Sequence, residues 1–186
     1  PWSYLATPRL AGWEERYDLR VRFRPVYPIA IRTPEFFEQV NPLWFRYFMV
    51  DVHRVAEFLG LPFRWPRPDP IVQDFATRKV AEDQPYIYRL TRMGQLAAGR
   101  GIGLALIDQV SRIIWDGKIA GWNEGTHLAD AVRRAGCDLE ELDAAITREA
   151  PRRDAAIAQN QADLESAGHW GVPTMVFAGE PFFGQD

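Results

Sequence analysis

The feature that most restricts the fold of this chain is the change of pattern at Gly171. A long polar helical stretch ends there, and residues 172–186 have the alternation of a β-hairpin. The hairpin begins with a Val172-Pro173 bond, the peptide type that adopts cis at little cost, and we expect it to be cis. A cis proline before a strand exposes the backbone N–H and C=O of Val172, with which an extended peptide pairs as an extra strand. A hairpin also needs neighbours for its edges, which disfavours an all-helical bundle.

The opening of the chain predicts a helix followed by a strand. Residues 2–15 carry apolar side chains at helical spacing, with Pro1 in the favoured first position. No Ser, Thr, Asp or Asn precedes Pro1 as a helix cap, so we expect the native chain to extend upstream. Residues 19–25 alternate apolar positions with Arg20, Arg22 and Arg24, which predicts a strand with one charged face. These two elements resemble the end of a βαβ unit whose first strand would precede Pro1.

Between residue 33 and about residue 168 the pattern is helical. We expect helices at 42–59, 84–99, 102–117, 125–136, 139–149 and 151–167, interrupted by a Pro-rich loop at 62–70. Asp138 with Glu141 three residues later predicts a capped start of one helix. The helix at 42–59 has an apolar stripe that we expect to be buried, formed by Phe45, Phe48, Met49, Val52, Val55 and Leu59. The order predicts one small sheet whose two halves are separated by a large helical insertion.

Composition excludes several classes of function. The 186 residues suffice for one domain with a sizeable insertion. A net charge of −3 provides no positive field for nucleic acid, and no apolar stretch is long enough to cross a membrane. The single cysteine, Cys137, forms no internal disulfide, and we expect it to be a small buried apolar residue in a cytoplasmic protein. His53 and His127 lack partners at metal-ligand spacing, so we expect no metal.

Several segments along the chain, most of all at its two ends, form a recognisable set. They are Pro1-Trp2-Ser3-Tyr4-Leu5-Ala6, Arg46-Tyr47, Asp51, Arg54, Gly60-Leu61-Pro62-Phe63, Gly171-Val172-Pro173-Thr174 and Phe182-Phe183-Gly184-Gln185-Asp186. Together they resemble a known family, the DsbA-like thioredoxin-fold proteins. Within it, the chain is most similar to the 2-hydroxychromene-2-carboxylate isomerases and the kappa-class glutathione transferases. The resemblance implies an α/β fold, with a thioredoxin-like domain formed by residues 1–30 and 151–186 and with residues 31–150 as the helical insertion.

The resemblance also implies a glutathione site. Ser3 matches the second Ser of a family motif at the helix start, where the helix dipole favours a thiolate. Asn41 lies where relatives place contacts to glutathione or substrate, although Pro42 departs from a Lys found in some of them. The backbone of Val172 beside Pro173 would pair with the cysteinyl part of glutathione. The γ-glutamyl end would be surrounded by Phe183, Gly184, Gln185 and Asp186.

Three functions remain open at this point. The first is a glutathione-dependent isomerase acting on a conjugated aromatic or ring-opened acid, and the second is a kappa-like glutathione transferase. The third is a thioredoxin-fold protein that binds without catalysis. Two-cysteine redox chemistry is excluded, because Ser3 occupies the second position of the required Cys-x-x-Cys. Ser3 could equally satisfy backbone groups, and we expect His169 to be a packed, hydrogen-bonded residue. Relatives imply a homodimer.

Overall fold

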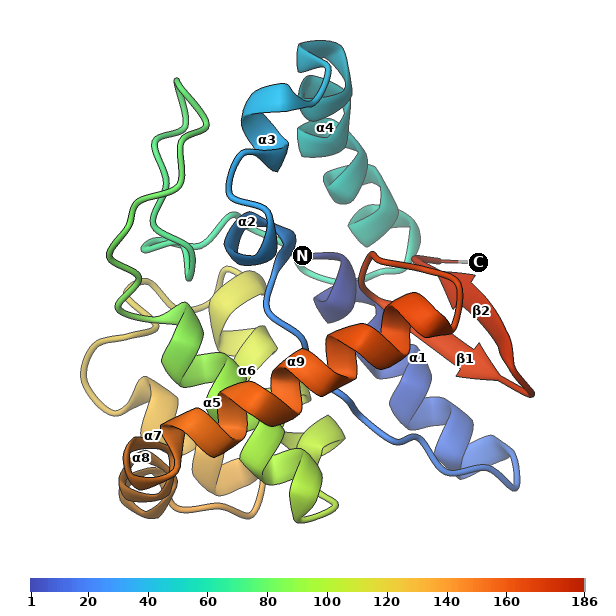
Figure 1. Ribbon diagram of the computed structural model, residues 1–186, viewed down its shortest axis with the longest axis vertical. Helices are drawn as coiled ribbons and strands as arrows, with labels where there is room; N and C mark the ends of the chain where they lie inside the picture. The colour runs from blue at the N-terminus through green and yellow to red at the C-terminus, as the bar shows by residue number, and fades with distance from the viewer. Residues whose placement is uncertain (186) are drawn as a thin grey trace.

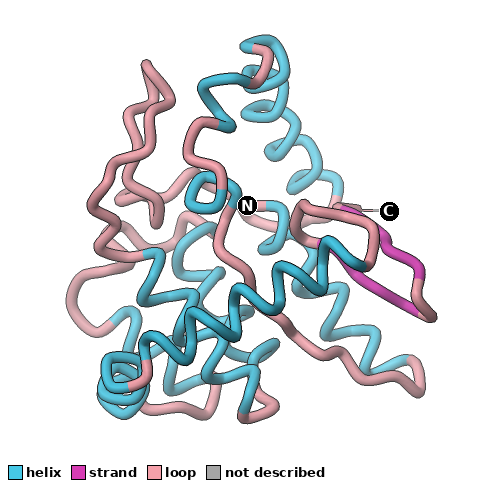
Figure 2. The backbone as a smooth tube through the Cα atoms, viewed as in Figure 1, coloured by secondary structure: helices cyan, strands magenta, loops and turns pink. Residues whose placement is uncertain are grey.

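The computed structural model describes residues 1–185 and is mostly helical, with one short hairpin at its end (Figures 1 and 2). The helices are α1 (Trp2–Arg16), α2 (Ile29–Arg32), α3 (Phe36–Gln39), α4 (Pro42–Phe58), α5 (Ile87–Gly99), α6 (Gly103–Trp115), α7 (His127–Arg134), α8 (Leu139–Arg148) and α9 (Ala150–Ser166). The strands are β1 (Thr174–Phe177) and β2 (Glu180–Phe183). The expected helices therefore form within a few residues of their predicted ends. The Pro-rich segment is a loop, and the Asp138 side chain caps α8 by accepting the Glu141 N–H at 2.8 Å.

The hairpin is antiparallel, and Thr174 pairs with Phe183 in its register. Its tip is formed by Ala178 and Gly179, which have φ values of 51° and 87°. Two consecutive residues with positive φ match the tight hairpin turn whose twist suits antiparallel strands. Within residues 1–185, β1 has β2 as its only ladder partner, so the other edge of β1 is open.

The strand expected at 19–25 does not form. Phe23 and Pro25 face the helices and Arg22 and Arg24 face outward, so the predicted alternation is present. However, the segment runs beside helices (Figure 2), and within residues 1–185 no strand pairs with it. Side chains hold it on α9 instead: Arg24 pairs with Asp163, and Asn160 donates to the Pro25 carbonyl at 2.9 Å. Alternation reports which side chains are buried, and it does not by itself supply a neighbouring strand.

Two clusters of buried side chains form the interior. The larger lies within the helical insertion, between α5, α6, α7 and α8, and includes Met93, Trp122 and Leu142. The smaller joins α1 to α4 and contains Tyr4, Leu5, Val52 and Ala56. The expected stripe of α4 is only partly buried, because Val52 is fully enclosed whereas Leu59 is 38% exposed. On a different face of α4, Leu43, Tyr47 and Val50 are 71%, 58% and 49% exposed. Among the described residues, no helix is long and apolar enough to span a bilayer.

A polar cluster fastens the segment after α1 to α5 and α9. Arg92 donates two hydrogen bonds to Asp154, at 2.8 and 2.7 Å, and the Tyr27 hydroxyl donates to the same carboxylate at 2.6 Å. Hydrogen bonding by Arg92 is the main cause of the lowered pKa of Asp154. A lowered folded-state pKa means that the ionised carboxylate stabilises the fold.

This cluster gives a pH-dependent prediction for Asp154→Asn. The stabilisation is fully present above the ordinary Asp pKa of about 4, and it is lost as the pH falls through the lowered folded-state pKa. We therefore expect the variant to be less stable than the native chain at pH 7, with the difference shrinking at about pH 3. Urea unfolding at both pH values measures it. An equal difference at the two values would show that the carboxylate charge is not responsible.

Candidate functional site

The site begins at the amino end of α1. Among the described residues, Pro1 provides no side-chain cap and no acidic residue lies in the first turn. The first backbone N–H groups of a helix have no partner within it, so this end carries a positive potential. Ser3 lies here, half-buried, and its carbonyl accepts the Thr7 hydroxyl at 2.7 Å. The end of α1 therefore suits an anion, and the Ser3 hydroxyl remains available to one.

The turn before β1 is organised by His169. The Gly171 N–H donates to Nδ1 of His169 at 2.9 Å, and the Thr174 hydroxyl donates to the Gly171 carbonyl at 2.7 Å. The His169 ring also stacks on Phe183, with ring centroids 4.3 Å apart. His169 is thus a packed, hydrogen-bonded residue, as the sequence predicted.

Val172 presents free backbone groups within this turn. The Val172–Pro173 bond is cis, Pro173 is buried and Val172 is only partly so. Within residues 1–185, neither the N–H nor the C=O of Val172 has a hydrogen-bond partner. These two groups directly precede the open edge of β1. Together they offer an extended peptide the donor and acceptor of one more strand.

Arg9 ties the end of the hairpin to α1. Its guanidinium donates to the carbonyls of Gly184 and Gln185, both at 3.3 Å, and the Gly184 N–H donates to the Pro173 carbonyl at 2.9 Å. Among the described residues, the buried Nε2 of Gln185 has no partner. The predicted Gly184 and Gln185 therefore lie beside both Pro173 and α1, whereas Asp186 lies outside the described residues. Sequence reasoning missed Arg9, whose position on α1 carries no motif.

A run of aromatic side chains provides a second link between the turn and α1. Trp170 contacts Phe36, Phe36 contacts Trp44, Trp44 stacks on Phe48, and Phe48 contacts Trp2, with centroid separations of 5.8, 6.1, 5.4 and 6.1 Å. We call these five residues the aromatic arc. Trp170 and Trp44 are 51% and 43% exposed, so part of each of these two residues is open to solvent. The sequence did not single it out as a site, because its members come from four separate segments.

Asn41 has a local structural role. Its side-chain oxygen caps α4 by accepting the Leu43 N–H at 2.9 Å, and the residue is exposed. Within residues 1–185, this cap is the one hydrogen bond that the Asn41 side chain makes. The structure places it at the α3–α4 junction, next to the Val40 carbonyl that accepts a hydrogen bond from Arg78.

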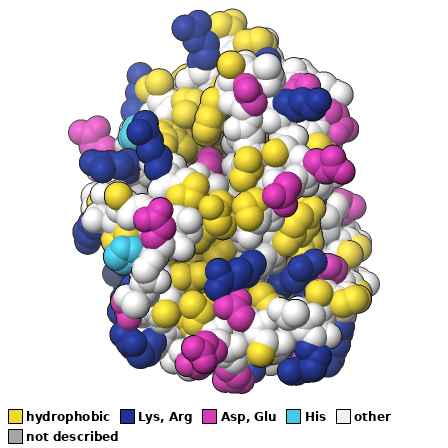
Figure 3. Space-filling view, turned by 90° about the vertical axis from the view of Figure 1, so that its left-hand side faces the viewer, with side chains coloured by type: hydrophobic (Ala, Val, Ile, Leu, Met, Phe, Trp, Pro, Cys, Tyr) yellow, Lys and Arg dark blue, Asp and Glu magenta, His cyan; other side chains and the backbone are white. Residues whose placement is uncertain are grey.

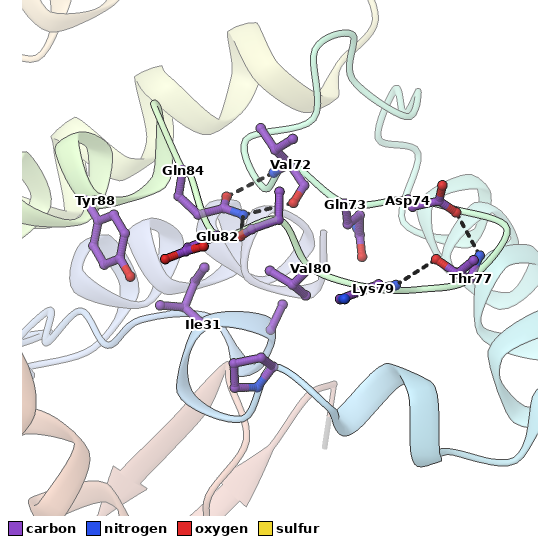
Figure 4. Close-up of a pocket in the computed structure, with 13 residues that line it drawn as sticks. Ile31, Val72, Gln73, Asp74, Thr77, Lys79, Val80, Glu82, Gln84 and Tyr88 are labelled. Carbon is purple, nitrogen blue, oxygen red and sulfur yellow. Dashed lines mark hydrogen bonds between the residues drawn. The ribbon is translucent and has the colours of Figure 1, made fainter.

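A separate cavity of about 800 Å³ lies between α2 and the loop 72–84 (Figure 4). Gln73, Lys79, Glu82 and Tyr88 line it together with apolar side chains such as Ile31. None of the residues that the sequence assigned to the site lines this cavity. It therefore does not mark the predicted peptide edge.

One face of the molecule shows basic and acidic side chains interspersed among hydrophobic ones (Figure 3). This face carries no continuous basic patch of the kind that binds nucleic acid. Across the described residues, no group of three His, Cys, Asp or Glu side chains is arranged to hold a metal ion.

Gly171 gives a testable measure of how tightly the turn is packed. A Cβ added there would lie 2.7 Å from the Phe183 ring and 2.9 Å from the His169 ring. We expect Gly171→Ala to displace both rings and to reduce stability by about 1–3 kcal/mol. Gly12→Ala is the matched control, because nothing lies within 4 Å of its added Cβ and a helix interior favours Ala by about 1 kcal/mol. Thermal unfolding of the two variants measures the difference in stability, and equal midpoints would contradict close packing of the two rings around Gly171.

Comparison with known proteins agrees with this architecture. The chain belongs to the DSBA-like thioredoxin domain family, whose match covers residues 1–186. Among solved structures it is similar to 2-hydroxychromene-2-carboxylate isomerase, with a TM-score of 0.70 and 19% sequence identity, covering 99% of this chain and 83% of that one. No curated protein sequence matches the chain. The fold is therefore the DsbA-like thioredoxin fold that the sequence predicted, with a two-stranded sheet in the described part of the chain.

Proposed function

We propose that this protein binds glutathione along Val172 and isomerises a conjugated aromatic or ring-opened acid. The observation that carries the proposal is the pair of unpartnered backbone groups of Val172 beside the open edge of β1. A tripeptide offers one N–H and one C=O at its central residue, which is the complement of that pair. The isomerase whose solved fold this chain shares supports the reaction class by analogy.

The start of α1 would hold the sulfur. Bound glutathione would supply a thiolate that adds reversibly to an activated double bond, allowing rotation before the thiolate leaves. The first N–H groups of α1 and the Ser3 hydroxyl would stabilise that thiolate through hydrogen bonds and the helix dipole. Gly184 and Gln185, fixed to α1 by Arg9, would surround the γ-glutamyl end.

The aromatic arc supports an aromatic or conjugated substrate. The half-exposed Trp44 and Trp170 side chains offer aromatic contact surface between the turn and Trp2 at the start of α1. Stacking of this kind favours flat, unsaturated ligands over saturated ones. A substrate held there would lie next to the sulfur position, which is what addition to its double bond requires.

Calorimetric titration with glutathione tests binding, and chromatography after incubation with a cis-configured conjugated aromatic acid tests the reaction. An isomerase converts the acid and leaves glutathione unchanged. A stable glutathione conjugate would instead establish the transferase, and binding without either product would establish the non-catalytic protein. Absence of binding would refute all three forms of the proposal.

We also propose a homodimer. The exposed apolar side chains of Leu43, Tyr47 and Val50 share one face of α4 and support it. Sedimentation equilibrium should give twice the 21.3 kDa mass of one chain, and a monomer mass would contradict it.

A further inference from the structure

One face of α4 is exposed along the whole length of the helix. From Leu43, steps of four, three, four and three residues follow this face, which is the spacing at which helical side chains share one side. Val52 lies on the opposite side and is fully buried, so that side faces the core. Figure 1 shows α4 at the outer edge of the molecule, beside α3. The exposed residues, which we call the outer stripe, are Leu43, Tyr47, Val50, Arg54, Glu57 and Phe58.

The outer stripe is apolar at both ends of the helix. Leu43 is 71% exposed near the start of α4, and Phe58 is 88% exposed at its end. A helix of this length spans about 25 Å, so the apolar side chains are spread over an extended surface. Exposed apolar residues aligned in this way mark an interaction surface, whereas scattered ones do not. The partner that fits such a surface is itself a long helix.

The charged side chains of this face have no ion-pair partner within residues 1–185. This holds for Arg46, Arg54 and Glu57, and for Asp51 beside them. Arginines on α5 differ, since Arg89 and Arg92 each pair with an aspartate. The two arginines of α4 balance its two carboxylates on this side, so the face has no net charge. Such a face suits a copy of itself and disfavours a strongly charged partner.

We propose that two copies of this chain pair through the outer stripe, with their α4 helices antiparallel and the two-fold axis between Val50 and Asp51. This pairing gives the proposed homodimer its interface. In this register Leu43 of each copy faces Phe58 of the other, so the most exposed apolar side chains of the stripe cover each other.

The charges select the antiparallel direction. In a parallel pair every residue of the stripe meets its own copy, so that Arg54 would face Arg54 and Glu57 would face Glu57. Like charges placed opposite each other are unfavourable. In the antiparallel pair Arg54 faces the ring of Tyr47, on which a guanidinium stacks. Arg46 and Glu57 of the two copies then lie on the same flank, within reach of each other's long side chains. The antiparallel pair thus provides partners for groups that the single chain leaves unpaired.

The pairing also brings a partner residue to the aromatic arc. Trp44 follows Leu43 on the flank of α4 that carries Phe58, so Phe58 of the partner subunit would meet the exposed part of Trp44. This step rests on the proposed function, in which the arc holds the aromatic substrate. A ring from the partner would close the outer side of the arc, so each site would be complete only in the dimer.

Disulfide trapping tests the direction and register of the two helices. Leu43→Cys and Phe58→Cys chains are prepared separately and oxidised in air, alone and as a mixture. We expect a disulfide-linked dimer from the mixture and none from either chain alone, because the two positions face each other only across the antiparallel pair. The native chain, which retains Cys137, is the control. A linked dimer from Leu43→Cys alone would show a parallel pair and would overturn the proposal.

Charge reversal tests the interface in solution by sedimentation equilibrium. Arg46→Glu and Glu57→Arg should each raise the dimer dissociation constant by about tenfold or more, since each substitution enters the dimer twice. The double variant should regain the native value, which a general loss of stability would not do. Tyr17→Arg is the matched control, because Tyr17 is 61% exposed at the end of α1, away from the stripe. A native monomer at every concentration, or reversals without effect, would refute the interface.

Two further measurements separate the interface from the proposed function. Arg46→Glu should keep glutathione affinity within about threefold, since Val172 and Ser3 lie outside the outer stripe. Phe58→Leu should keep the dimer and raise the KM for the aromatic acid by about threefold or more at unchanged kcat. An unchanged KM would overturn only the contribution of Phe58 to the arc. Failure of the native dimer to bind glutathione would overturn the proposed function and leave the interface standing.

Discussion

Replacing Trp122 by Ala should reduce the free energy of unfolding by about 3–5 kcal/mol, the largest stability loss expected of a single substitution here. Trp122 is 2% exposed within the larger core cluster and makes an edge contact with Tyr86 at 5.4 Å. The truncation leaves a cavity and also leaves the Pro68 carbonyl without its donor at 2.8 Å. Urea denaturation measures the loss.

Trp122→Phe separates the two contributions. A phenyl ring fills much of the space but cannot donate to the Pro68 carbonyl, so we expect a smaller loss of about 1–3 kcal/mol. Hydrogen exchange should report faster opening of the loop around Asp69 in both variants, since the indole N–H holds that loop. A loss below about 1 kcal/mol for Trp122→Ala would show that this indole is not a principal support of the core.

Methylating the cysteinyl backbone nitrogen of glutathione should weaken its binding by about tenfold or more, the largest effect expected on ligand affinity. The methyl group removes the N–H that would donate to the Val172 carbonyl and places carbon where a hydrogen bond should form. Competition calorimetry against glutathione measures the difference. The change is in the ligand, so it cannot act by unfolding the protein.

Val172→Ala is the control on the protein side. Its backbone keeps the same N–H and C=O, so we expect glutathione affinity to change by less than about threefold. Equal affinity for glutathione and the methylated analogue would contradict pairing with the Val172 backbone. A large loss in Val172→Ala would assign recognition to the side chain instead.

Local signals account for the elements that sequence predicted well. The helices and the C-terminal hairpin are marked by short-range chemistry, such as the Asp138 cap of α8 and the Ala178-Gly179 turn. The prediction of a strand at 19–25 was wrong because strand formation depends on more than local signals. Its alternation describes which side chains are buried, but a strand requires a partner elsewhere in the fold, and here the partner is helix α9.

The residues of the candidate site also fall into two groups, those that a local sequence pattern indicated and those that it did not. Val172 and Pro173 were predicted from the pattern of one short segment, and Gly184 of the same segment was assigned by resemblance. Arg9 was missed, because its role depends on contacts with residues far away in the sequence. Asn41 was assigned by resemblance, and its side chain caps α4.

A crystal structure of the glutathione complex tests the central claim most directly. The account predicts that the cysteinyl residue pairs with the N–H and C=O of Val172 through two hydrogen bonds of about 2.9 Å, with its sulfur at the first turn of α1. Glutathione bound instead in the cavity between α2 and the loop 72–84, with Val172 unpaired, would contradict it.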